Sequence, residues 1–133
     1  MKKIIINNEY VALVIKKIST SERIEFFTEP DDLFQIAAFS MNKSQNIQPH
    51  LHLDQSRSIK GTSEVLFVQK GELLVNFYKN RIKNSIEKTV TLKKGDLIYI
   101  KCGIHGFEIG KDCEFIEIKQ GPYIDGQDKI KLY

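Results

Sequence analysis

Hydrophobic and polar positions alternate along this chain in short runs, and turn-forming residues separate one run from the next. Runs of about 4–8 residues rich in Ile, Val, Leu, Phe and Tyr are typical of β-strands. No window shows a sustained helical period, so the pattern predicts an all-β sandwich or barrel. The strands expected from the pattern are Ile4–Ile6, Tyr10–Ile15, Arg23–Thr28, Leu33–Met41, Ile47–Leu53, Ser63–Gln69, Glu72–Lys79, Glu87–Leu92, Leu97–Lys101, Gly106–Ile109 and Glu114–Lys119.

Three connections between these strands carry turn chemistry. Glu29–Asp32 contains Pro and two Asp residues, and Lys93–Asp96 ends in Gly-Asp. The pair Lys70-Gly71 predicts a hairpin that joins the strands on either side of it. Residues 121–133 are expected to be turn-like, with a possible last strand at Lys129–Leu132.

Composition narrows the class of protein. The chain has 133 residues, 41% hydrophobic and 28% charged, which suits one globular domain rather than a disordered chain. The net charge of +3 is scattered, without a basic stripe and interleaved aromatics, so we expect no nucleic-acid partner. No run reaches the roughly 18 apolar residues of a membrane span, so we expect no membrane insertion. Two cysteines, Cys102 and Cys113, make no disulfide framework and indicate reduced thiols in the cytoplasm.

The chain's three histidines suggest a metal site. On a strand, residues two apart point the same way, so His50 and His52 can converge on one point. His105 lies far downstream, and neutral imidazole is a good ligand for transition metals. Glu64 is the first residue of an otherwise apolar strand. A carboxylate in such a place needs a positively charged or hydrogen-bonding partner, so Glu64 could be a fourth metal ligand. The alternative is two solvent-facing histidines and a Glu64 that pairs with a nearby lysine.

Two motifs resemble those of the cupin superfamily. The first is Pro49-His50-Leu51-His52 followed by Glu64 and, seven residues later, Gly71; the second runs from Gly95-Asp96 to Gly103-Ile104-His105. The resemblance covers roughly residues 45–120 and implies a jelly-roll β-barrel, or double-stranded β-helix. It also implies a divalent transition metal (Zn, Fe, Mn or Ni) inside the barrel. By position, the implied ligands are His50, His52, Glu64 and His105.

One departure from the cupin pattern is the spacing of the first motif. Eleven residues separate His52 from Glu64, where three or four are usual, so an inserted segment lengthens a loop or two strands at the barrel mouth. We expect a single domain over residues 1–133. It would comprise N-terminal strands in 1–44, a barrel core in 45–120 and a C-terminal tail in 121–133.

A narrower resemblance lies at the end of the chain. Glu117–Tyr123 followed by Asp128-Lys129 is similar to the closing signature of small cupins found beside cell-surface polysaccharide genes. It implies a carbohydrate-derived ligand and isomerase or epimerase chemistry on a sugar or nucleotide-sugar. The base would be Glu108 or Tyr123. A non-heme metal dioxygenase and a non-catalytic sugar-binding module remain as alternatives, so the sequence leaves open whether the protein is an enzyme.

Other side chains are candidates for contact with a ligand. Arg57 and Lys60, in the inserted segment, could bind a phosphate or carboxylate, or could simply be solvated. Three aromatic residues could either contact the ligand or pack in the core: Tyr99, Phe107 and Tyr123. Cys102 could face the metal, although a buried thiol is usually inert packing. The apolar N-terminal strands would shield sheet edges by pairing between copies, so we expect a homodimer.

Overall fold

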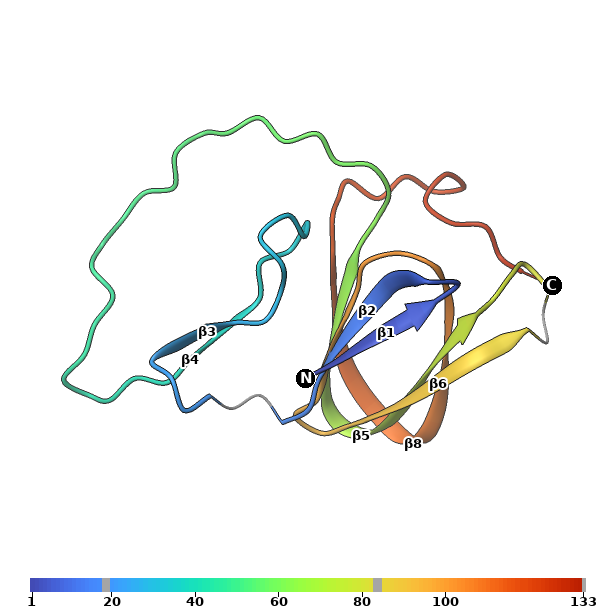
Figure 1. Ribbon diagram of the computed structural model, residues 1–133, viewed down its shortest axis with the longest axis horizontal. Helices are drawn as coiled ribbons and strands as arrows, with labels where there is room; N and C mark the ends of the chain where they lie inside the picture. Colours follow the sequence, from blue (N-terminus) through green and yellow to red (C-terminus); the bar gives the residue numbers. More distant parts are fainter. Residues whose placement is uncertain (18–19, 83–84, 133) are drawn as a thin grey trace. The chain divides into compact units, whose positions relative to one another are not determined.

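The protein is built from β-strands. A computed structural model describes residues 1–17, 20–82 and 85–132. Every regular element within these ranges is a strand, which confirms the all-β class (Figure 1). The described ranges contain no helix long and apolar enough to cross a membrane. The chain divides into two compact units, which are described separately: Met1–Ile18 with Thr62–Tyr133, here called the sheet unit, and Ser19–Gly61, here called the hairpin unit.

The sheet unit contains six antiparallel strands. They are β1 (Lys2–Ile6), β2 (Glu9–Ile15), β5 (Glu64–Tyr78), β6 (Ile86–Lys93), β7 (Leu97–Ile100) and β8 (Ile104–Lys119). Their order is β1-β2-β7-β5-β6, and β8 pairs with β5 along the length of that strand. Asn7 and Asn8 join β1 to β2 with φ values of 50° and 64°, the left-handed pair that a tight hairpin turn needs.

The sheet curls because its two longest strands bend together (Figure 1). On one side of β5, β7 pairs with residues 64–67 and β6 pairs with residues 72–78. β7 and β6 therefore together line this edge of the bent strand. The predicted turn Lys93–Asp96 lies at this bend and is confirmed by an amide-to-carbonyl hydrogen bond of 2.9 Å from Asp96 to Lys93. On the other side, the β5–β8 register shifts three times between Val68 and Leu73.

The predicted hairpin at Lys70-Gly71 is wrong, because the chain continues through it as one 15-residue strand. The predicted break between Gly106–Ile109 and Glu114–Lys119 is likewise absent from the 16-residue β8. Gly71 has a φ of 77°, and a Cβ there would stand 1.8 Å from the carbonyl oxygen of Asp112. The glycine therefore permits two backbones to approach at a bulged bend rather than reversing the chain.

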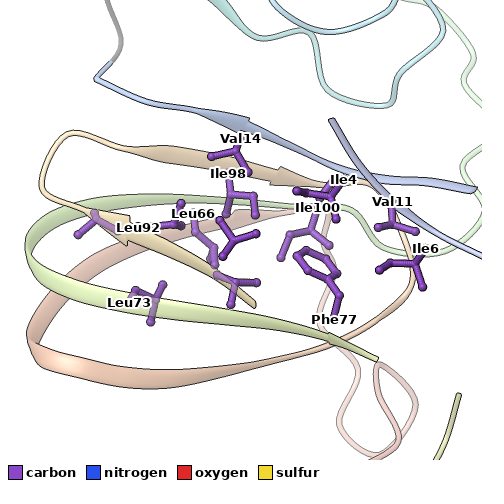
Figure 2. Close-up of a cluster of buried hydrophobic side chains, with 14 residues drawn as sticks. Ile4, Ile6, Val11, Val14, Leu66, Leu73, Phe77, Leu92, Ile98 and Ile100 are labelled. Atoms are coloured by element: carbon purple, nitrogen blue, oxygen red, sulfur yellow. The ribbon is translucent and has the colours of Figure 1, made fainter. Parts of the chain in front are cut away.

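The hydrophobic core fills the inside of the curl, on what we call the inner face (Figure 2). In β5, alternation brings Leu66 and Val68 to this face before the bend and Leu73, Val75 and Phe77 after it, all at 0% exposure. Burial of each such side chain contributes about 1.5–3 kcal/mol of transfer free energy. β1, β2, β6 and β7 complete the cluster with Ile4, Ile6, Val11, Ala12, Val14, Val90, Leu92, Ile98 and Ile100.

The hairpin unit has little regular structure. Its two strands, β3 (Ile24–Phe26) and β4 (Ala37–Phe39), are shorter than predicted. The predicted strand at Ile47–Leu53 is absent: residues 45–60 have no regular structure, and Leu51 is 85% exposed. A strand needs a neighbour to take up its backbone hydrogen bonds, and this polar segment has none assigned. In the sheet unit, the predicted strand Lys129–Leu132 is also absent.

Candidate functional site

Glu64 and His105 meet at the inner face of the sheet unit. Glu64 opens β5 and shares the face of Leu66, while His105 lies near the start of β8 opposite Phe77. In the β5–β8 ladder the two residues are at opposite ends, since Glu64 pairs with Lys119. The curl of the sheet brings them together, and His105 Nε2 lies 3.2 Å from Glu64 Oε2.

Backbone contacts fix the orientation of the imidazole. His105 Nδ1 lies 3.0 Å from the Gly103 carbonyl oxygen, which can only accept, so Nδ1 carries the proton and Nε2 faces Glu64. Burial alone would lower the pKa of His105, but the hydrogen bonds to Glu64 and Gly103, with the charges of Glu64 and Glu117, outweigh it and raise this pKa. The hydrogen bond from His105 lowers the pKa of Glu64 despite partial burial. Without a metal ion, the contact between the two side chains favours the imidazolium form of His105 and the carboxylate form of Glu64.

The same pair has the spacing of two ligands on one ion. Metal–nitrogen and metal–oxygen bonds of about 2.0–2.2 Å at angles of about 90–109° place the two donor atoms roughly 2.8–3.6 Å apart. The observed 3.2 Å between His105 Nε2 and Glu64 Oε2 lies within that range. A backbone carbonyl that accepts a hydrogen bond from Nδ1–H, as that of Gly103 does here, commonly orients the ring of a metal-binding histidine. These two donors therefore fit a transition metal, although two donors are too few to hold it alone.

His50 and His52 form a second pair, within the hairpin unit. Their ring centroids are 5.1 Å apart at an interplanar angle of 77°, and both residues are exposed. His50 Nδ1 lies 2.9 Å from the carbonyl oxygen of Gln48, two residues earlier. His105 Nδ1 makes the same kind of contact, at 3.0 Å, with the carbonyl oxygen of Gly103. Nε2 of a neutral His50 therefore carries a lone pair that can bind a metal ion. Among the described residues, no group of three or more His, Cys, Asp or Glu side chains is arranged to hold a metal ion.

Three inner-face residues of β8 near this pair were not predicted as site residues, although two of them lie within the closing signature at the end of the chain. Register places Phe115, Glu117 and Lys119 on the face of Val68, Leu66 and Glu64, respectively. Phe107 links them to His105, with ring centroids 5.5 Å from His105 and 6.3 Å from Phe115. The period-2 spacing of residues 115, 117 and 119 was visible in the sequence, but the curl that turns them toward His105 was not.

Lys119 is the centre of a charged cluster at the end of β8. Its ammonium group lies 3.2 Å from Asp128 Oδ2 and 3.3 Å from Glu117 Oε1, and 5.3 Å from the centroid of the Tyr123 ring. Asp128 and Tyr123 belong to the C-terminal segment after Gly121-Pro122, so Lys119 attaches this segment to the sheet. Lys119 and Lys129 also act on Glu64, because the charge of each lowers its pKa.

Two predicted site residues lie away from the inner face. Glu108 pairs with Leu74 on the opposite face of β8 from His105, and its Oε1 accepts a hydrogen bond of 2.7 Å from Asn76. Tyr99 is fully buried and points away from the face that carries Ile98 and Ile100. Phe107 and Tyr123, by contrast, are both partly accessible, at 37% and 56% exposure.

The remaining candidates are two exposed basic residues and a thiol of low reactivity. Arg57 and Lys60 are exposed in the hairpin unit. Cys102 packs against the core, and burial together with a hydrogen bond to Glu9 raises the pKa of its thiol to about 11. A raised pKa lowers the thiolate fraction at neutral pH, which makes Cys102 a poor nucleophile there.

Comparisons of this chain with protein-family models, with curated proteins and with solved structures find no match.

Proposed function

We propose that this chain is a cupin-type jelly-roll protein that binds a divalent transition metal ion and acts on a sugar or nucleotide-sugar in surface polysaccharide metabolism. The observation that carries the proposal is the Glu64–His105 pair. Two residues that the cupin motifs single out, 41 positions apart, lie 3.2 Å apart on the inner face of a curled sheet.

Glu64 and His105 would supply two ligands. The motif resemblance assigns His50 and His52 as ligands as well. A bound ion would polarise a substrate oxygen and acidify an adjacent C–H or O–H group. Phe107, beside His105, is available to contact the apolar face of a sugar ring. Of the two candidate bases, Tyr123 is favoured: it reaches the inner-face residue Lys119, whereas Glu108 projects from the opposite face.

The metal proposal is tested by elemental analysis of protein purified without a polyhistidine tag and reconstituted with Zn²⁺. The wild type should hold about one ion per chain. Glu64→Gln, His105→Ala and the double variant His50→Ala, His52→Ala should lose most of it. Glu108→Gln is the matched control, because it removes a carboxylate from the other face of β8. Equal metal in the wild type and in the double histidine variant would remove these residues from the site.

The reaction is tested by turnover of a nucleotide-sugar panel with and without added Zn²⁺, Fe²⁺, Mn²⁺ or Ni²⁺. We expect epimerised or isomerised product only with metal. Oxygen consumption under Fe²⁺ loading would instead identify a dioxygenase, and tight sugar binding without chemical change would identify a binding module. The two free cysteines suit the reducing cytoplasm, where we propose that the protein acts.

A further inference from the structure

Lys119 lies directly opposite Glu64 in the β5–β8 ladder, on the same face. Cβ atoms of opposite residues in an antiparallel pair are about 4.5–5.5 Å apart, and a lysine side chain easily spans that gap. Lys119 and Glu64 are therefore within reach of an ion pair. They do not form one: in the described residues Glu64 pairs with His105, and Lys119 pairs with Glu117 and Asp128.

The two carboxylates that hold Lys119 come from different places. Glu117 lies two residues earlier on the same face of β8, while Asp128 is supplied by the C-terminal segment. The side chains of Lys119 and Asp128 are only 23% and 16% exposed, so their contact is sheltered from water and is worth more than a surface ion pair. Tyr123, from the same segment, makes a cation–π contact with the ammonium group of Lys119.

We propose that Asp128 is a positioning residue that holds Lys119 away from Glu64 and so keeps the Glu64 carboxylate available to a metal ion. A lysine released from Asp128 would turn to Glu64 and compete with the ion for the same oxygens. The inference rests on the proposed metal site, and it gives the C-terminal segment a role in that site without making it a ligand.

The test is a mutant cycle, with Zn²⁺ and Co²⁺ affinity measured by titration calorimetry. Asp128→Asn should weaken binding about tenfold, the low end of what loss of an outer-shell partner costs. Lys119→Met should bind at least as tightly as the wild type. The double variant Asp128→Asn, Lys119→Met should return to within about threefold of the wild type, because the competitor is gone.

A second double variant separates competition from net charge. Asp128→Asn, Lys129→Met has the same formal charge as the first double variant, and Lys129 also acts on Glu64, but Lys119 stays free. This second double variant should still bind the metal ion about tenfold more weakly than the wild type. Glu114→Gln is the matched single control, since it removes a carboxylate from the exposed Lys70–Glu114 pair on the same two strands.

Each outcome decides the inference. If Asp128→Asn binds like the wild type, or if both double variants recover equally, the positioning role is overturned. If the Lys119→Met double variant stays weak, Asp128 acts only by ordering the tail. If the wild type binds neither Zn²⁺ nor Co²⁺, the proposed function and this inference are both wrong. If the wild type binds an ion and Glu64→Gln does not, the proposed metal site stands whatever the mutant cycle shows.

Discussion

Replacement of Asp96 should destabilise the sheet unit by far more than replacement of its lysine partner. The Asp96 side chain is 5% exposed and accepts three hydrogen bonds: from the Lys93 amide at 2.8 Å, the Lys17 amide at 3.0 Å and Lys16 Nζ at 2.7 Å. A hydrogen bond to a charged group contributes about 1.5–3 kcal/mol, so the two amides together give at least about 3 kcal/mol. Lys16 is 53% exposed, and such a pair contributes only about 0–1 kcal/mol.

The assay is urea unfolding followed by circular dichroism at pH 7. Asp96→Ala should lower the free energy of unfolding by about 3 kcal/mol, a midpoint shift of about 1.5–2 M urea for a typical slope. Lys16→Met should cost about 1 kcal/mol or less, and Asp96→Asn, which keeps one acceptor oxygen, should fall between. Equal losses for Asp96→Ala and Lys16→Met, or a loss below 1 kcal/mol for Asp96→Ala, would refute the reasoning.

The pH dependence gives a second check on Asp96. Burial alone would raise the pKa of this carboxyl, but hydrogen bonds from Lys16, Lys93 and Lys17 outweigh burial and lower it. A lowered pKa in the folded state stabilises the protein above the unfolded value, about 3.9, and the stabilisation is lost as pH falls through the folded value. The difference between wild type and Asp96→Asn should therefore be constant from pH 5 to 7 and shrink below about pH 4. A difference that grows as pH falls would contradict the direction.

Three further predictions concern the bend, the thiol and the oligomer. Both Gly71 and Gly61 have a φ of 77°, but only at Gly71 would a Cβ meet a neighbouring backbone, so in urea unfolding Gly71→Ala should cost about 3 kcal/mol more than Gly61→Ala. Equal costs for the two variants would contradict this. Cys102 should react with iodoacetamide much more slowly at pH 7 than an unstructured thiol, and its rate should rise toward pH 11; mass spectrometry that finds fast labelling at pH 7 would reject a protonated thiol. Light scattering at micromolar concentration should give the mass of a homodimer, and a monomer mass would reject the expected pairing of copies.

Local patterns in the sequence predicted the elements that local chemistry controls. The apolar run Ile4–Ile6 predicted β1, and Gly95-Asp96 predicted the turn before β7. The all-β class followed from the absence of a helical period. The strand predicted at Ile47–Leu53 was wrong, because an alternating pattern forms a strand only where a neighbouring strand takes up its backbone hydrogen bonds. The presence of that neighbour depends on distant parts of the chain.

The sequence by itself determined which residue types are available for chemistry: three imidazoles, and a carboxylate at the head of an apolar strand. Only the tertiary structure decided that β5 and β8 bend together at Gly71 instead of breaking, because a glycine allows either a turn or a close approach and the facing backbone selects between them. That bend places Glu64 beside His105 and opposite Lys119. The β5–β8 register is set by pairs of residues that are 26 positions apart (Tyr78 and Ile104) to 55 positions apart (Glu64 and Lys119), so no local pattern could have placed Lys119 in this cluster.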